Sequence, residues 1–205
     1  MNVITRNLFS LLRSGALNEY EPIEPMSEFK WKRLEQMVNA QHVENTAWKG
    51  VRNHQYDEMM NIPEHLIKES SPTDTQQQPA QLSNRFLNAR LQRILNNERH
   101  AIDTNIGAIE VLNIIINNVS SMLNNGSMLS GLIRLGSYLR NKGDKVDYVK
   151  VENWLNKLHI RRMAQLQGSM LISVFNFEPV ELPFVNRIEP AAHNLVMRSV
   201  EHAAN

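Results

Sequence analysis

The chain of 205 residues contains no cysteine. This absence excludes disulfide bridges, cysteine-ligated zinc, iron–sulfur clusters and a cysteine nucleophile. It leaves the cellular compartment open, because a reducing cytosol permits cysteine without requiring it.

An excess of charge of one sign is also missing, since 22 basic residues face 21 acidic ones. Dedicated nucleic-acid binders usually carry a clear basic excess, so we do not expect nucleic acid as the main partner. Long apolar runs are missing too, because the richest one, residues 114–116, is flanked by asparagines. Arg6 and Arg13 interrupt the N-terminal segment, unlike a secretory signal. We therefore expect a cytoplasmic protein with no membrane partner.

What the chain does have is helical periodicity from residue 101 to residue 172. Ile109, Leu112, Ile116 and Val119 recur at helical spacing, and a polar stripe lies opposite. This pattern predicts a central helix over 104–124 that begins at an Asp103 N-cap. Further helices are predicted over 128–142 and 148–175. Internal Gly131 and Gly136 would weaken the first of these unless a neighbouring helix approaches closely.

The N-terminal part is predicted to be helical as well. A helix over 2–13 should stop at Gly15, and a second should start after Ser27 with Trp31 on its buried face. Residues 70–81, SSPTDTQQQPAQ, contain two prolines and no large apolar residue, which is typical of a linker or surface loop.

These patterns predict an all-α, single-domain irregular helical bundle. Its parts are an N-terminal helical region (1–69), a linker or surface loop (70–81), a helical core (82–178), and an extended proline-containing arm with a terminal helix (179–205). The arm begins within FNFEPVELPFV, residues 175–185, in which Pro179 and Pro183 oppose regular helix.

Two fragments of the helical block could suggest catalysis. Gly126-Ser127 is similar to the Gly-Ser pair that opens a nucleotidyltransferase site, and Asp144 and Asp147 could form a carboxylate pair. Strand geometry would place two carboxylates on one face at D-x-D spacing, whereas these aspartates are separated by two residues. We interpret Gly126, Ser127 and Asp147 as helix caps and Asp144 as a loop residue.

Histidines and carboxylates gather at a few other places. The densest group of potential metal ligands is His54, Asp57, Glu58 and His65, which lacks a His-Glu-x-x-His pattern. We interpret it as a charged helix end. His100 and Asp103 lie at helical spacing, and His159 precedes Arg161-Arg162, but no nucleophile adjoins either histidine in the sequence. We assign no catalytic residue, no metal ligand and no cofactor.

Two basic segments could form binding surfaces. Trp31 lies among Lys30, Lys32 and Arg33, as aromatic residues do in some single-strand binders, but its spacing assigns it to the core. The helix after the linker is basic and would suit an acidic partner or a phosphate. Its cations are Arg85, Arg90, Arg93 and Arg99.

Two blocks of the chain resemble the helical regions of a nucleotidyltransferase-like family. They are LLRSGALNE with FKWKRLEQMVNAQHV, and MLSGLIRLGSYLRNKG with DYVKVENWLNKLHIRRMAQLQG. The resemblance covers about half the chain and implies a catalytic sheet between the blocks, with a Gly-Asp-x-Asp carboxylate pair. No residues of this chain match that signature. The resemblance therefore implies a shortened relative that has lost the catalytic core.

We accordingly expect a non-catalytic helical accessory or protein-interaction protein with a protein partner, and homo-oligomerisation stays open. Two alternatives remain. One is a divergent nucleotidyltransferase-type enzyme whose magnesium-binding carboxylates would be Asp57, Glu58 and Asp103. The other is a nucleic-acid-binding helical module that uses the four arginines after the linker.

Overall fold

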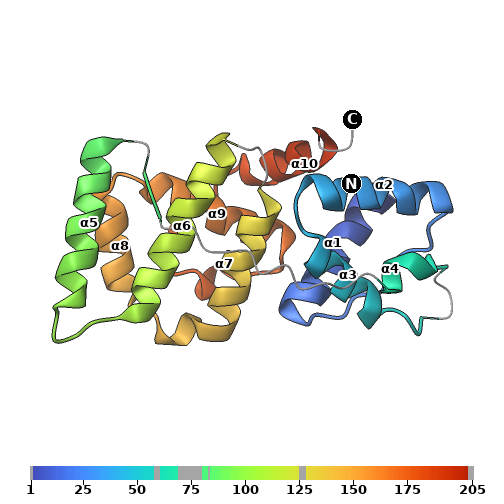
Figure 1. The fold of residues 1–205 in the computed structure, drawn as a ribbon, viewed down its shortest axis with the longest axis horizontal. Coiled ribbons are helices and arrows are strands. Elements are labelled where there is room, and N and C mark those ends of the chain that lie inside the picture. Colours follow the sequence, from blue (N-terminus) through green and yellow to red (C-terminus); the bar gives the residue numbers. More distant parts are fainter. Residues whose placement is uncertain (1, 58–60, 69–79, 83, 125–127, 203–205) are drawn as a thin grey trace. The chain divides into compact units, whose positions relative to one another are not determined.

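A computed structural model describes residues 2–57, 61–68, 80–82, 84–124 and 128–202. These residues form helices and connecting segments, and no strand occurs among them, which confirms the all-α prediction (Figure 1). The chain divides into two compact units, one of residues 1–76 and 196–205 and the other of residues 77–195. The predicted division into an N-terminal region, linker, helical core and arm within one domain stays a prediction. Of the predicted linker, residues 70–81, only residues 80 and 81 are described.

The described residues of the first unit, unit 1, form four N-terminal helices and the end of the C-terminal helix. Its helices are α1 (Val3–Leu17), α2 (Glu28–Ala40), α3 (Glu44–Asn53) and α4 (Glu64–Lys68), and α10 (Ala192–His202) belongs to it from Val196 onward. Trp31, Leu34 and Val38 are buried on α2, as the sequence predicted.

Helices α1 and α3 are in backbone contact through two glycines. A Cβ on Gly15 would lie 1.9 Å from the Thr46 carbonyl oxygen, and one on Gly50 would lie 2.1 Å from that of Leu11. The predicted stop at Gly15 is wrong because α1 continues to Leu17 and ends at Asn18, whose φ is 57°. Gly15 serves close helix packing instead of termination.

Polar side chains hold the segment between α1 and α2. The Asn7 amide donates to the Glu24 carbonyl oxygen at 2.7 Å and accepts from the Glu24 N–H at 2.9 Å. Asn7 and His54 are both buried, and the His54 Nε2 lies 2.9 Å from the Glu21 carbonyl oxygen. These contacts satisfy backbone groups in a segment that has no regular hydrogen bonding of its own.

The second unit, unit 2, surrounds helix α6. Its helices are α5 (Arg85–Arg99), α6 (Ile106–Asn124), α7 (Leu129–Lys142), α8 (Tyr148–Lys157) and α9 (Arg161–Val174), with short 3₁₀ helices at Gly143–Lys145 and Pro179–Glu181. Helix α6 packs against α7, α8 and α9. Leu112, Ile116 and Val119 of its predicted stripe are buried, as are Ile114 and Ile115.

A buried amide network crosses the core of unit 2. Asn118 on α6 donates to Gln167 Oε1 on α9 at 2.9 Å and to the Gly131 carbonyl oxygen on α7 at 3.0 Å. Gln167 donates in turn to the Ile115 carbonyl oxygen at 3.1 Å. A Cβ on Gly131 would lie 2.4 Å from Asn118 Oδ1, so this glycine makes room for the network, as its position inside a helix had suggested.

The N-caps of unit 2 follow the prediction in one case and not in another. Asp147 caps α8 by accepting from the Lys150 N–H at 3.1 Å, which confirms its predicted role. The Asp103 cap is wrong, because α6 begins at Ile106 and Asn105 Oδ1 accepts from the Ala108 N–H at 2.7 Å. Gly126 and Ser127 lie outside the described residues.

The segment after α9 is folded back over that helix. Phe177, Leu182 and Phe184 are buried, and a Cβ on Gly168 would lie 2.2 Å from a Val185 methyl group. Glu189 is fixed to α9, since Gln165 donates to its carboxylate at 2.9 Å. The aromatic residues of FNFEPVELPFV are thus part of the core. None of the helices in the described part of the chain has the length and apolar content needed to cross a bilayer.

Candidate interaction site

A surface groove of about 340 Å³ lies between α5 and α8 in unit 2, where the two helices run side by side (Figure 1). Its lining is basic and includes no carboxylate. The lining residues are Arg90, Arg93, Ile94, Asn97, Lys157 and His159. We call it the basic groove.

Arg90 connects the two walls of the basic groove. Its guanidinium donates to the Lys157 carbonyl oxygen at 3.3 Å and lies 3.2 Å from His159 Nε2. Arg90 thereby satisfies a carbonyl group at the C-terminal end of α8, where helix carbonyls lack partners within the helix. His159 has a φ of 56°, which turns the chain out of α8 and places its ring beside Arg90.

The other cations of the basic groove have no carboxylate neighbour within ion-pair distance in the described part of the chain. Arg93 and Lys157 are exposed, and no salt bridge includes either of them. The acidic residue of α5, Glu98, is buried and receives a 2.7 Å hydrogen bond from Lys150. The positive charge of the basic groove is therefore available to an external anion.

An exposed aromatic residue continues this surface along α5. Phe86 is 80% exposed and lies one turn before Arg90, with Arg93 and Asn97 at the following turns of the same stripe. Exposed phenylalanine beside arginine is a composition that protein interfaces favour.

Two of the four arginines predicted on this helix line the basic groove. Arg90 and Arg93 are in its wall, whereas Arg85 and Arg99 are exposed elsewhere on α5. Lys157 and Asn97 were missed by the sequence analysis. The signal for Lys157 was its position at the end of a helix just before His159 and Arg161-Arg162, a second basic segment that the chain brings back to α5.

The predicted metal-ligand group is only partly described, because Glu58 lies outside the described residues. His54 is fully buried, its Nδ1 lies 2.8 Å from the Gly50 carbonyl oxygen, and its ring stacks on Tyr20. Asp57 accepts from the Tyr20 hydroxyl at 2.6 Å, which raises the pKa of that tyrosine. His65 Nε2 lies 3.8 Å from a carboxylate oxygen of Glu35 instead.

The other carboxylates and histidines considered as site residues occupy structural positions in unit 2. Asp103 accepts from Lys150 at 3.1 Å, and this contact lowers the pKa of Asp103. Asp103 belongs to unit 2 and Asp57 to unit 1. Asp144 lies in the 3₁₀ helix after α7, and His100 occupies the C-cap of α5. No group of three histidine or carboxylate side chains suited to a metal ion occurs within the described ranges.

The predicted core position of Trp31, within the basic segment of α2, is confirmed. Trp31 is only 1% exposed, whereas Lys32 is exposed and Arg33 is half-buried. The aromatic ring is therefore withheld from any stacked base.

No known family model, curated protein or solved structure matches this chain. Kinship with the nucleotidyltransferase-like family stays a prediction.

Proposed function

We propose that this chain is a non-catalytic helical interaction protein, and that its unit 2 binds an acidic segment of a partner protein in the basic groove. The observation that carries the proposal is a groove with three cationic side chains and no carboxylate in its lining. Charge complementarity of this kind steers association and selects partners.

Charge distribution along the chain supports an acidic partner. Unit 2 contains 13 basic and 9 acidic residues, although the whole chain is nearly neutral. The positive charge is thus local, which suits a short acidic segment better than a long polyanion. Ile94 in the groove and the exposed Phe86 add apolar contacts, which a partner with leucine or isoleucine among its acidic residues would cover.

Fluorescence anisotropy with a defined probe tests this proposal. The probe is a fluorescein-labelled 14-residue peptide that alternates glutamate pairs with leucine, titrated with the full chain at low and at physiological salt. We expect saturable binding that weakens as salt rises, because surface charges are screened over about 8–10 Å.

Matched double variants locate the binding surface. Arg90→Gln with Arg93→Gln removes two charges from the groove, and Arg85→Gln with Arg99→Gln removes two from the same helix outside it. The first pair should weaken peptide binding by about 10-fold or more and the second by less than about 3-fold. Equal losses, or no binding by the unchanged protein, would overturn the proposal.

Two further probes separate the alternatives. Tighter binding of a labelled 14-nucleotide single-stranded DNA or RNA than of the peptide would overturn the protein partner in favour of a nucleic-acid-binding module. A thermal shift with ATP that requires Mg²⁺ would favour the divergent enzyme instead.

A further inference from the structure

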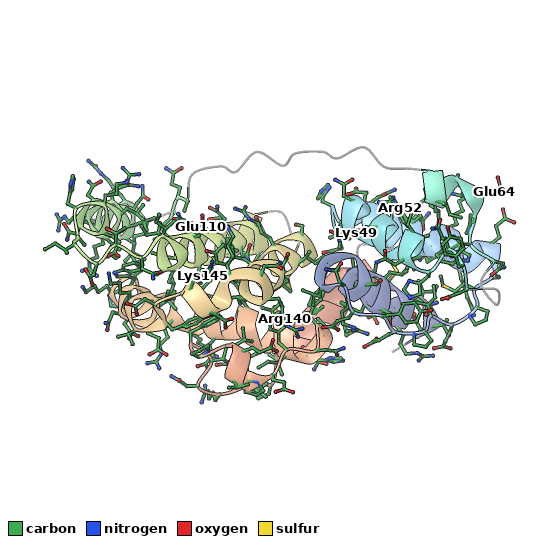
Figure 2. The ribbon with its side chains drawn as sticks, turned by 90° about the horizontal axis from the view of Figure 1, so that it is seen from below. Lys49, Arg52, Glu64, Glu110, Arg140 and Lys145 are labelled. Carbon is green, nitrogen blue, oxygen red and sulfur yellow. The ribbon has the colours of Figure 1, made fainter. Side chains whose placement is uncertain are left out.

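A second pocket, of about 370 Å³, lies between α6 and α7 in unit 2, away from the residues of the basic groove. We call it the α6–α7 pocket. Residues of both helices line it: Glu110, Asn113 and Ile114 from α6, and Arg134, Ser137, Tyr138, Asn141 and Lys142 from α7. Figure 2 labels Glu110 on α6. The volume falls in the range of small-molecule sites.

The one carboxylate of this lining is already engaged. Glu110 accepts a hydrogen bond from the Tyr138 hydroxyl and lies 3.8 Å from Lys142 Nζ. Burial and then this hydrogen bond raise the pKa of Tyr138, so the tyrosine stays protonated and remains a donor to Glu110 at neutral pH. Lys142 also lies over the Tyr138 ring, 5.4 Å from its centroid. These three side chains form one neutralised group at one end of the pocket.

Arg134 is the second cation of the pocket lining, besides Lys142. It is half-buried in the wall, and no salt bridge within the described residues includes it. A guanidinium removed from water in this way is stabilised by a planar anion that it can contact with two N–H groups. A carboxylate has that geometry.

An unmet hydrogen-bond acceptor lies in the opposite wall. The Oδ1 of Asn113 is buried and has no hydrogen-bond partner. Rotation about χ2 of asparagine is soft, so this oxygen can turn toward a donor that enters the pocket. A buried acceptor without a partner is destabilising, and a ligand hydroxyl or amine would supply the missing hydrogen bond.

We propose that the α6–α7 pocket binds a small carboxylic acid with a hydroxyl or amino group near its carboxylate. Arg134 holds the carboxylate, and Asn113 accepts a hydrogen bond from the neighbouring donor group. The site uses other helices and other side chains than the basic groove, so its existence does not depend on the proposed protein partner.

Isothermal titration calorimetry with a matched pair of compounds tests the site in the full chain. The probes are 3-hydroxybutyrate and butyrate, which differ only in the hydroxyl group. We expect 3-hydroxybutyrate to bind with a Kd of about 1 mM or tighter and butyrate at least about 10-fold more weakly. Inorganic phosphate, which lacks the planar carboxylate, should bind more weakly than 3-hydroxybutyrate.

Single variants assign the two roles separately. Arg134→Gln should weaken binding of both acids by about 10-fold or more, and Arg134→Lys should retain part of it. Asn113→Ala should abolish the preference for the hydroxyl group while leaving butyrate affinity nearly unchanged, a result that a purely structural role would not produce. Arg162→Gln, an exposed cation on α9, is the control and should bind as the unchanged protein does.

Circular dichroism confirms that each variant is folded before its binding is measured. The proposal is overturned if the unchanged protein binds neither acid, or if Arg134→Gln binds both as tightly as before. It is also overturned if phosphate matches 3-hydroxybutyrate, since the pocket would then recognise anionic charge alone. A hydroxyl preference that persists in Asn113→Ala would likewise exclude the assigned role of Asn113.

Discussion

The two units of this molecule join their helices in different ways. In unit 1, α1 and α3 meet backbone to backbone because Gly15 and Gly50 leave no side chain between them. In unit 2, α6 meets α7 and α9 through apolar side chains and the Asn118–Gln167 amide network. A backbone contact cannot adjust to added volume, whereas side chains can shift. The same class of substitution should therefore have unequal effects in the two units.

The units also differ in charge. Unit 1 contains 9 basic and 12 acidic residues, and unit 2 contains 13 and 9. The whole-chain net charge of +1 conceals this difference. The near-zero net charge therefore does not exclude a binding site for an anionic partner, because a local basic surface can exist on a nearly neutral chain.

The largest effect is expected from Gly50→Ala in unit 1. The new methyl group would lie 2.1 Å from the Leu11 carbonyl oxygen, so α1 and α3 must separate and lose packing along their length. We expect a loss of about 3 kcal/mol or more in the free energy of unfolding, measured by urea denaturation.

The matched substitution in unit 2 is Gly136→Ala. Its methyl group would meet the ends of Leu171 and Phe177 side chains at 3.2 Å, which can move slightly. Alanine also favours helix over glycine by about 1 kcal/mol, so the net change should stay within about 1 kcal/mol. Equal destabilisation by the two alanines would contradict the contrast between the units.

An effect smaller than that of Gly50→Ala is expected from Asn118→Ala in the unit 2 network. The change removes the two hydrogen bonds that the Asn118 amide donates, one to Gln167 Oε1 and one to the Gly131 carbonyl oxygen. Both acceptors then lack this donor. We expect a loss of about 2 kcal/mol, measured in the same denaturation experiment. Ser120→Ala is the control on α6, because its hydroxyl donates to the exposed Gln81 carbonyl oxygen. A change below that of the control would show that the network is dispensable.

His54→Phe tests how much the polar contacts of the buried His54 ring stabilise unit 1. The new ring has a similar shape but lacks both nitrogens, which contact the carbonyl oxygens of Gly50 and Glu21 at 2.8 and 2.9 Å. We expect a loss of about 1–2 kcal/mol in thermal denaturation, since the backbone carbonyl that accepts the ring N–H loses its donor. A gain in stability would mean that the apolar surroundings of the ring outweigh its hydrogen bonds.

The smallest effect concerns pH and the exposed Arg6–Glu24 pair of unit 1. The hydrogen bond from Arg6 lowers the pKa of Glu24 below its ordinary value of 4.5. A lowered carboxyl pKa contributes stability above the unfolded value and loses it as pH falls through the folded value. Glu24→Gln should therefore lower Tm slightly at pH 7, and the difference should vanish at low pH. A difference that grows on acidification would contradict the assignment.

Much of the fold could be predicted from local patterns. The stripe of Leu112, Ile116 and Val119 is buried, and Asp147 caps α8, because both features depend on residues within one helical turn of each other. The errors occurred where a distant contact decided the outcome. Gly15 reads as a helix stop in isolation, yet it is a packing residue because Thr46 lies against it. Asp103 forms an ion pair with Lys150, and Asn105 caps α6 in its place.

The candidate sites could be predicted less well. The sequence indicated a basic helix with Arg90 and Arg93, but the second wall comes from Lys157 and His159, more than sixty residues later. The α6–α7 pocket gave no sequence signal, because its asparagine and arginine lie on separate helices and neither belongs to a motif.

The sequence by itself determined that the described chain is helical, and it determined most of the buried faces and the absence of cysteine chemistry. Helical periodicity and caps act over three or four residues, so the order of residues is enough to specify them. Only the tertiary structure decided which glycines touch a neighbouring helix and which cations share a groove. It also decided which carboxylates are already paired. These properties depend on residues that are distant in the chain and adjacent in space, and no local pattern encodes that adjacency.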